Sequence, residues 1–239
     1  MMQSKGFFIL GTDTNVGKTT IAVSLLSFLK AYGYSTIGLK PISSGAQLSK
    51  VGLRNSDAIA LQEAATIHLP YEHVNPFCFS LAIAPHIAAE QQGFQLNLAK
   101  IMQSFHPLLN YEADYCVIEG LGGVAVPLNK TETMLDVLQA LNLPVIFVVG
   151  LSLGCLNHAL LTYEILRKRN ISIVACICNQ IDPEMLFHEE NGLYLKQSID
   201  VPFFSFVRYQ KLNASMTDIG IEWSNLIKLE DFSCLPKHD

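Results

Sequence analysis

The chain has 239 residues and a net charge of −5; half of its residues are hydrophobic and only 15% are charged. This composition excludes a disordered chain, a coiled coil and a basic nucleic-acid-binding protein, all of which need more charge. Mean hydropathy is +0.30, but the longest strongly apolar stretch, residues 143–151, is far shorter than the roughly 20 residues that span a bilayer. We therefore expect one domain over residues 1–239, with no signal peptide and no membrane partner.

Short apolar runs alternate with helical patterns along the chain. Strands are expected at residues 6–11, 35–40, 115–119, 145–150, 171–178 and 201–207. Helices are expected at residues 18–32, 56–65, 96–109, 133–141, 156–169 and 183–197. This alternation predicts an α/β fold with a doubly wound, mostly parallel sheet flanked by helices, whose strands are apolar because both faces are covered. Residues 43–95 are less regular and are expected to form an insertion over the active edge of the sheet.

The first strand runs into the sequence GTDTNVGKTT at residues 11–20, which opens the first helix. This is the setting of a phosphate-binding P-loop, because successive backbone N–H groups and the helix dipole face an anion there. Lys18 would reach the terminal phosphates and the Thr19 hydroxyl would bind Mg²⁺. The spacer between the glycines has five residues instead of four, so Thr12 stands where the generic motif has its first glycine.

Three charged residues follow at places where P-loop chemistry needs them. Glu119 closes the third strand, where the metal-binding acid of such enzymes lies, and the glycines after it allow close approach to a ligand. Lys40 ends the second strand and could contact phosphate, although a lone lysine there is more commonly solvated. Asp57 could be a metal ligand, but a first-turn helix acid is its commoner role.

The second half of the chain carries weaker signals. The sequence LGCLNH at residues 153–158 opens a helix and could bind an anion. Asn179 follows the fifth strand and suits recognition of a nucleotide base through its amide. Cys116, Cys176 and Cys178 lie in apolar runs and no CxxC pair occurs, so we expect reduced, buried thiols in a cytoplasmic protein.

Taken together, these motifs resemble the dethiobiotin synthetase family. The resemblance rests on GTDTxVGKT at 11–19, KPxxSG at 40–45, GLRNSD at 52–57, VNP at 74–76, PH at 85–86, EGxGG at 119–123, PVIxVVG at 144–150, LGCxNH at 153–158, and Asn179. It extends in the same order from residue 6 to residue 202, and the five-residue spacer is the family's own form.

The resemblance implies a P-loop NTPase fold and an ATP-dependent cyclo-ligase of biotin biosynthesis. The implied substrates are 7,8-diaminononanoate, CO₂ and ATP, with ATP as co-substrate and Mg²⁺ as cofactor. The diamine would form a carbamate, then a carbamic–phosphoric anhydride, and the second amine would close the ring to dethiobiotin with release of ADP and phosphate. The resemblance also implies a cytoplasmic homodimer with the substrate site at the subunit interface.

The family's roles carry over to matching positions. The implied catalytic residues are Lys18 and Lys40, and the implied metal ligands are Thr19, Asp57 and Glu119. The implied ATP-binding residues are Asn15, Val16, Gly17, Lys18, Thr19, Thr20, Asp57, Glu119, Gly120, Leu121, Gly122, Asn179, Gln180, Pro202, Phe203 and Phe204. The implied substrate-binding residues are Thr14, Lys40, Ser44 and Gly122, together with Leu153, Gly154, Cys155 and Asn157 from the other subunit. Asn15, Leu121 and Gln180 depart from the residues that are common in the family.

Two other classes of protein have different sequence features. A partitioning or site-selection ATPase would carry an early lysine in its P-loop where this chain has Asp13, and commonly a membrane-binding amphipathic tail or a basic DNA-binding surface. Lys228 and Lys237 in residues 226–239 are balanced by three acids, so the tail is not a basic membrane helix. An amidotransferase-type synthetase would need an additional glutaminase domain with a cysteine nucleophile, for which the chain is too short.

Overall fold

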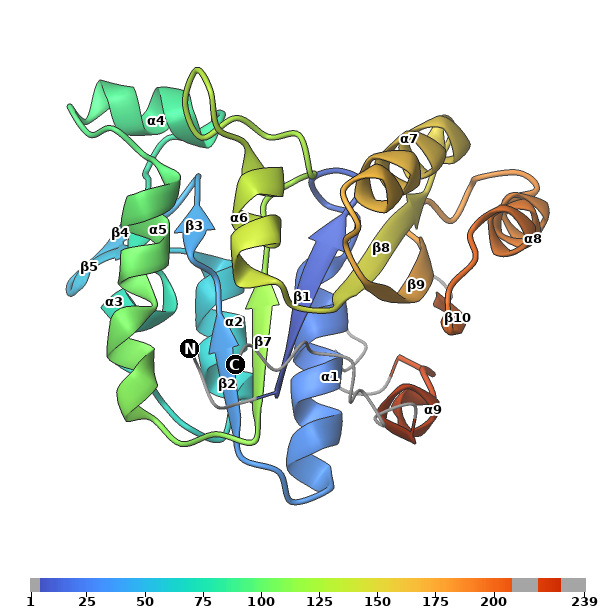
Figure 1. The fold of residues 1–239 in the computed structure, drawn as a ribbon, viewed down its shortest axis with the longest axis horizontal. Helices are drawn as coiled ribbons and strands as arrows, with labels where there is room; N and C mark the ends of the chain where they lie inside the picture. The colour runs from blue at the N-terminus through green and yellow to red at the C-terminus, as the bar shows by residue number, and fades with distance from the viewer. Residues whose placement is uncertain (1–4, 208–218, 229–239) are drawn as a thin grey trace.

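The computed structural model describes residues 5–207 and 219–228. Its centre is a six-stranded sheet in the order β10-β9-β8-β1-β7-β2, in which every neighbouring pair is parallel (Figure 1). The strands are β1 (Lys5–Gly11), β2 (Thr36–Leu39), β7 (Tyr115–Glu119), β8 (Val145–Leu151), β9 (Ile173–Gln180) and β10 (Phe203–Val207). This confirms the predicted doubly wound α/β fold.

The sheet is buried on both faces, which explains its apolar strands. Along β1, Phe8 and Leu10 face one hydrophobic cluster while Phe7 and Ile9 face the other, as the two-residue period of a strand requires. Helices from the middle and second half of the chain pack on the first cluster, whereas α1 and α9 pack on the second. Parallel strands covered in this way can be apolar throughout, so the high hydropathy belongs to a two-sided core.

The predicted helices are present, with differences at their ends. The helices are α1 (Lys18–Ala31), α2 (Ser56–Ala64), α3 (Tyr71–Val74), α4 (Pro85–Gln91), α5 (Leu98–Ser104), a 3₁₀ helix (His106–Asn110), α6 (Met134–Leu141), α7 (Cys155–Lys168), α8 (His188–Ser198) and α9 (Trp223–Lys228). The helix expected at 96–109 is broken after Ser104, because Pro107 lacks a backbone donor and restricts the residue before it. The helix expected from residue 183 begins only at His188, since the Asp182 carboxylate accepts a hydrogen bond from the Glu184 N–H and forms a turn.

The insertion at residues 43–95 contains small elements that the sequence pattern did not indicate. They include two pairs of short strands: β3 (Ile42–Ser43) with β6 (Phe77–Cys78), and β4 (Gln47–Ser49) with β5 (Gly52–Arg54). Strands of two or three residues carry no readable period, so sequence patterns miss them. Several residues of this insertion line the cleft described below.

The C-terminal helix α9 packs against the helix that begins at the P-loop. Trp223 is buried there, and its Nε1–H donates a hydrogen bond of 3.0 Å to Ser24 Oγ of α1. Cys116, Cys176 and Cys178 are free and buried, as expected, and burial raises the pKa of the Cys116 thiol. Residues 229–239 of the tail lie outside the described residues. Within the described ranges, none of the helices combines the length and apolarity needed to cross a membrane.

Candidate active site

The loop between β1 and α1 has the backbone shape of an anion cradle. Asn15 and Gly17 adopt left-handed conformations, with φ of 59° and 93°. The space beside Gly17 is filled by the amide of Asn179, so a side chain at residue 17 would collide with it. Asn179 Nδ2 also donates a hydrogen bond of 3.0 Å to the Val16 carbonyl. Asn179 therefore braces the loop from the end of β9.

Lys18 begins α1 and is buried under this loop. Its Nζ donates a hydrogen bond of 2.6 Å to the Asp13 carbonyl. Burial, together with the nearby Lys40 ammonium, lowers the pKa of Lys18 from 10.5 to about 8. A bound anion strongly stabilises the charged form of such a lysine, because it replaces the solvation that the ammonium group loses on burial.

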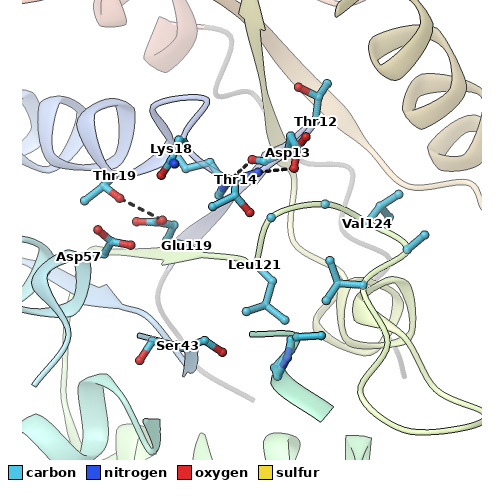
Figure 2. Close-up of a pocket in the computed structure, with 18 of the residues that line it drawn as sticks. Thr12, Asp13, Thr14, Lys18, Thr19, Ser43, Asp57, Glu119, Leu121 and Val124 are labelled. Atoms are coloured by element: carbon cyan, nitrogen blue, oxygen red, sulfur yellow. Dashed lines mark hydrogen bonds between the residues drawn. The ribbon is translucent and has the colours of Figure 1, made fainter. Parts of the chain in front are cut away.

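Glu119, at the end of β7, is the centre of a buried charged cluster and is only 1% exposed. Its Oε1 accepts hydrogen bonds from Lys40 Nζ at 2.6 Å and from Thr19 Oγ1 at 3.1 Å (Figure 2 shows the latter). Lys40 Nζ also donates to the Gly120 carbonyl at 3.0 Å and lies 3.6 Å from Asp57 Oδ2. Lys40 is thus buried and paired, not the solvated cap that is commoner for a lone lysine.

The oxygen atoms around Glu119 fit Mg²⁺. Glu119 Oε2 is buried and accepts no hydrogen bond within the described part of the chain. The Thr19 hydroxyl and the Asp57 carboxylate lie near the Glu119 carboxylate (Figure 2). Among residues 5–207 and 219–228, no group of three or more His, Cys, Asp or Glu side chains forms a protein-only metal cage. One hydroxyl and two carboxylates suit Mg²⁺, which usually keeps several waters.

These groups line a cleft of about 1120 Å³, at the carboxyl edge of the sheet. Its polar lining residues are Thr12, Asp13, Thr14, Asn15, Gly17, Lys18, Thr19, Thr20, Lys40, Ser43, Ser44, Asn55, Asp57, Glu119 and Gly122. The rest of the lining is mostly apolar and includes Ala82, Ile83, Ala84, Pro85, Leu121, Val124, Ala125, Val126, Pro127, Leu161 and Ile165, with His158 and Thr162. No sequence motif had pointed to the apolar residues of α7 or of the loop after Gly123. Pro85, Leu121 and His158 are the members of this apolar group that fall within the motifs PH, EGxGG and LGCxNH.

Some of the expected site residues lie elsewhere. Leu153, Gly154, Cys155 and Asn157 do not line the cleft of their own subunit, and Leu153 is fully exposed. Pro202, Phe203 and Phe204 do not meet Asn179, because Phe203 pairs with Ala175 while Asn179 pairs with Val207. The expected common base site of Asn179 and residues 202–204 is therefore not formed. Parallel pairing places the start of β10 beside the first half of β9, away from the carboxyl edge.

The strand–loop–helix unit, the buried lysine at its end and the acid on a neighbouring strand define a P-loop nucleotide-binding protein. The fold agrees: a ParA family ATPase from Chlorobium tepidum aligns with a TM-score of 0.52 and 15% identity over 96% of this chain and 93% of that chain. The septum site-determining protein MinD from Pyrococcus horikoshii aligns with a TM-score of 0.51 and 17% identity over 94% and 86%. At such low identity these likenesses concern the fold alone.

Sequence comparison narrows the class. The AAA domain family matches residues 5–214. An ATP-dependent dethiobiotin synthetase from Cellvibrio japonicus is 45% identical over 96% of this chain and 100% of that protein. The corresponding synthetase from Pseudomonas paraeruginosa is 42% identical over 82% and 86%. With this identity over nearly its whole length, the chain belongs to the dethiobiotin synthetase family and is a ligase that forms C–N bonds.

Proposed function

We propose that this chain carboxylates 7,8-diaminononanoate with CO₂ and closes the product to dethiobiotin at the expense of ATP. The observation that carries the proposal is the position of the buried Lys40–Glu119 pair. It shares one cleft with the P-loop and with a set of apolar lining residues. ATP would deliver its γ-phosphate at the P-loop, while the aliphatic part of the diamine would lie along the apolar lining residues. The family membership agrees with this arrangement.

The chemistry divides into three balanced steps. One amine adds to CO₂ and loses a proton, which forms a carbamate. A carbamate oxygen attacks the γ-phosphorus and the bond to ADP breaks, which forms a carbamic–phosphoric anhydride. The second amine then attacks the carbonyl carbon, phosphate leaves with the bonding electrons, and the amine releases its proton. Each step joins groups that must be held in line, so positioning and charge neutralisation supply most of the catalysis.

The chain's own residues would act as follows. Backbone N–H groups of residues 15–20 bind the phosphates, and Lys18 reaches the terminal ones. Lys40 stabilises the negative charge that the carbamate and the transferring phosphoryl group share. Thr19, Asp57 and Glu119 hold Mg²⁺, which neutralises phosphate charge when it is bound. Thr14, Ser44 and Gly122 contact the diamine, and Asn179 and Gln180 lie near the base.

We further propose a homodimer with the substrate site at its interface. Large apolar side chains are exposed at or near the open end of the cleft: Ile83 and Leu161 line it, and Ile87 and Leu153 lie on α4 and just before α7. The segment from Leu153 to Asn157 opens α7 and would bind the substrate carboxylate in the partner's cleft. A reducing, cytoplasmic location fits the free cysteines of the described residues.

The experiment is incubation of the protein with 7,8-diaminononanoate, bicarbonate, Mg²⁺ and ATP, followed by mass spectrometry of the products. We expect dethiobiotin in equal amount to ADP and phosphate, and none when bicarbonate or the diamine is omitted. Phosphate release without the cyclic product would instead favour an ATP-driven switch.

A further inference from the structure

A series of hydrogen bonds, buried at Asn75 and partly buried at Tyr71, connects the backbone of Lys40 to residues outside the cleft. Asn75 is 2% exposed and follows α3. Its Nδ2 donates to the Lys40 carbonyl at 2.5 Å, and its Oδ1 accepts from Ser43 Oγ at 2.7 Å. The same Oδ1 accepts a second hydrogen bond, of 3.0 Å, from the Tyr71 hydroxyl. Asn75 thus ties the turn after β2 to α3.

The series of hydrogen bonds continues from Tyr71 to α2, the helix that carries Asp57. The Tyr71 hydroxyl accepts a hydrogen bond of 2.7 Å from the Asn55 N–H. Asn55 is the N-cap of α2, and its Oδ1 accepts from the N–H groups of Asp57 and Ala58 at 3.1 and 3.2 Å. The Arg54 guanidinium lies 4.0 Å over the Tyr71 ring and holds its plane. The start of α2, and with it Asp57, is therefore located by Tyr71.

The two residues at the ends of this series of hydrogen bonds, Lys40 and Asp57, lie close together inside the site. Lys40 Nζ lies 3.6 Å from Asp57 Oδ2, which closes a ring through Asn75, Tyr71 and Asn55. Two backbone hydrogen bonds reinforce it, from Lys40 N–H to the Val74 carbonyl and from Phe77 N–H to the Pro41 carbonyl. The ring consists of buried and partly buried hydrogen bonds and is closed by this ion pair. A closed ring of this kind has few ways to relax, so the backbones of Lys40 and Asp57 are held at one separation.

We propose that Tyr71 and Asn75 are positioning residues that set the separation of the Lys40 ammonium and the Asp57 carboxylate. Neither residue lines the cleft, so both act through the residues that they hold. The inference rests on the proposed function, in which Lys40 faces the reacting oxygens and Asp57 faces Mg²⁺. Ligand carboxylates depend on such supporting hydrogen bonds, and small displacements of reacting groups are costly.

The test compares Tyr71→Phe with Tyr163→Phe. Tyr163 is a suitable control because its buried hydroxyl also makes two hydrogen bonds, both to the Asp200 backbone, at 3.1 and 3.3 Å. The two variants should therefore lose similar stability. For Tyr71→Phe we expect kcat to fall by at least about tenfold, with the KM for ATP unchanged because the P-loop backbone is untouched. Tyr163→Phe should keep the wild-type kcat.

A second readout does not depend on turnover. ADP binding is titrated by calorimetry at increasing Mg²⁺ concentration, and Tyr71→Phe should require at least about tenfold more Mg²⁺ than Tyr163→Phe. Equal Mg²⁺ dependence in the two variants overturns the proposal, as does an equal kcat. If the wild type makes no dethiobiotin, the proposed function fails, while the ADP titration still decides whether Tyr71 positions the site.

Discussion

Replacement of Lys18 by Met should abolish the use of ATP and yet stabilise the protein in the absence of nucleotide. Burial holds the pKa of Lys18 at about 8 instead of 10.5. The folded state therefore disfavours the charged ammonium, and at about 1.4 kcal/mol for each pKa unit the cost is about 3 kcal/mol at pH 7. Loss of the hydrogen bond to the Asp13 carbonyl offsets roughly 1 kcal/mol, which leaves a net gain of about 2 kcal/mol.

The stability that Lys18→Met gains over the wild type must decrease as pH rises. Between pH 8 and 10.5 the folded protein has released the Lys18 proton while the unfolded chain still binds it. The wild type therefore becomes more stable, relative to the Lys18→Met variant, as pH rises through this window. The charge penalty falls to about 1 kcal/mol at pH 10, which the lost hydrogen bond cancels. The variant's advantage is expected at pH 7 and absent at pH 10.

Calorimetric melting without nucleotide tests this reasoning. For a chain of this size, a Tm rise of roughly 4–8 °C is expected for Lys18→Met at pH 7. The control is Lys30→Met, which removes an exposed lysine from the same helix and should give no such rise. Mg·ADP should raise the Tm of the wild type much more than that of Lys18→Met. A Tm of Lys18→Met at or below the wild-type value at pH 7, or a difference that does not change with pH, would refute the argument.

Three further predictions concern the cleft. Lys40→Leu should lower kcat by about 10²–10³-fold while Mg·ADP still binds; full activity in steady-state assays would remove Lys40 from the mechanism. Leu121, for which the family resemblance implies an ATP contact, lies among the apolar residues that line the cleft; Leu121→Ala should therefore raise the KM for the diamine about tenfold and leave that for ATP unchanged, and the opposite pattern would instead support the ATP contact. Inactive Lys18→Gln and Asn157→Ala proteins, once mixed, should regain activity through heterodimers; no recovery despite proven subunit exchange would count against a shared site.

The sheet and the P-loop could be predicted because their signals are local. Each strand is a short apolar run, and GTDTNVGKTT lies directly between a strand and a helix. Glu119 and Lys40 could be placed at one edge because parallel strands end together. The sequence did not show that Lys40 and Glu119 pair, since nothing in it tells whether a lysine at a strand end is buried. In the structure Asp57 lies near Lys40 and Thr19 donates a hydrogen bond to Glu119, and both come from distant parts of the chain.

The features that the sequence did not predict depend on contacts between distant segments, and such contacts produce no periodic pattern in the sequence. The ring through Asn75, Tyr71 and Asn55 joins segments that are 16 to 35 residues apart. Residues 202–204 were expected beside Asn179, but the register of β10 against β9 keeps the two apart, and a strand register depends on packing that motif order does not record. The apolar lining of the cleft gathers residues from three separate segments, and most of these residues, such as Val124 and Ile165, lie outside the motifs.

The most direct test of the account follows the oxygen atoms of bicarbonate. The protein is incubated with ¹⁸O-labelled bicarbonate, 7,8-diaminononanoate, Mg²⁺ and ATP, under conditions in which exchange with water is slow. If a carbamate oxygen attacks the γ-phosphorus, each phosphate carries one ¹⁸O atom and each dethiobiotin retains one in its ring carbonyl. Dethiobiotin formed alongside unlabelled phosphate, or ATP hydrolysis without dethiobiotin, would contradict it.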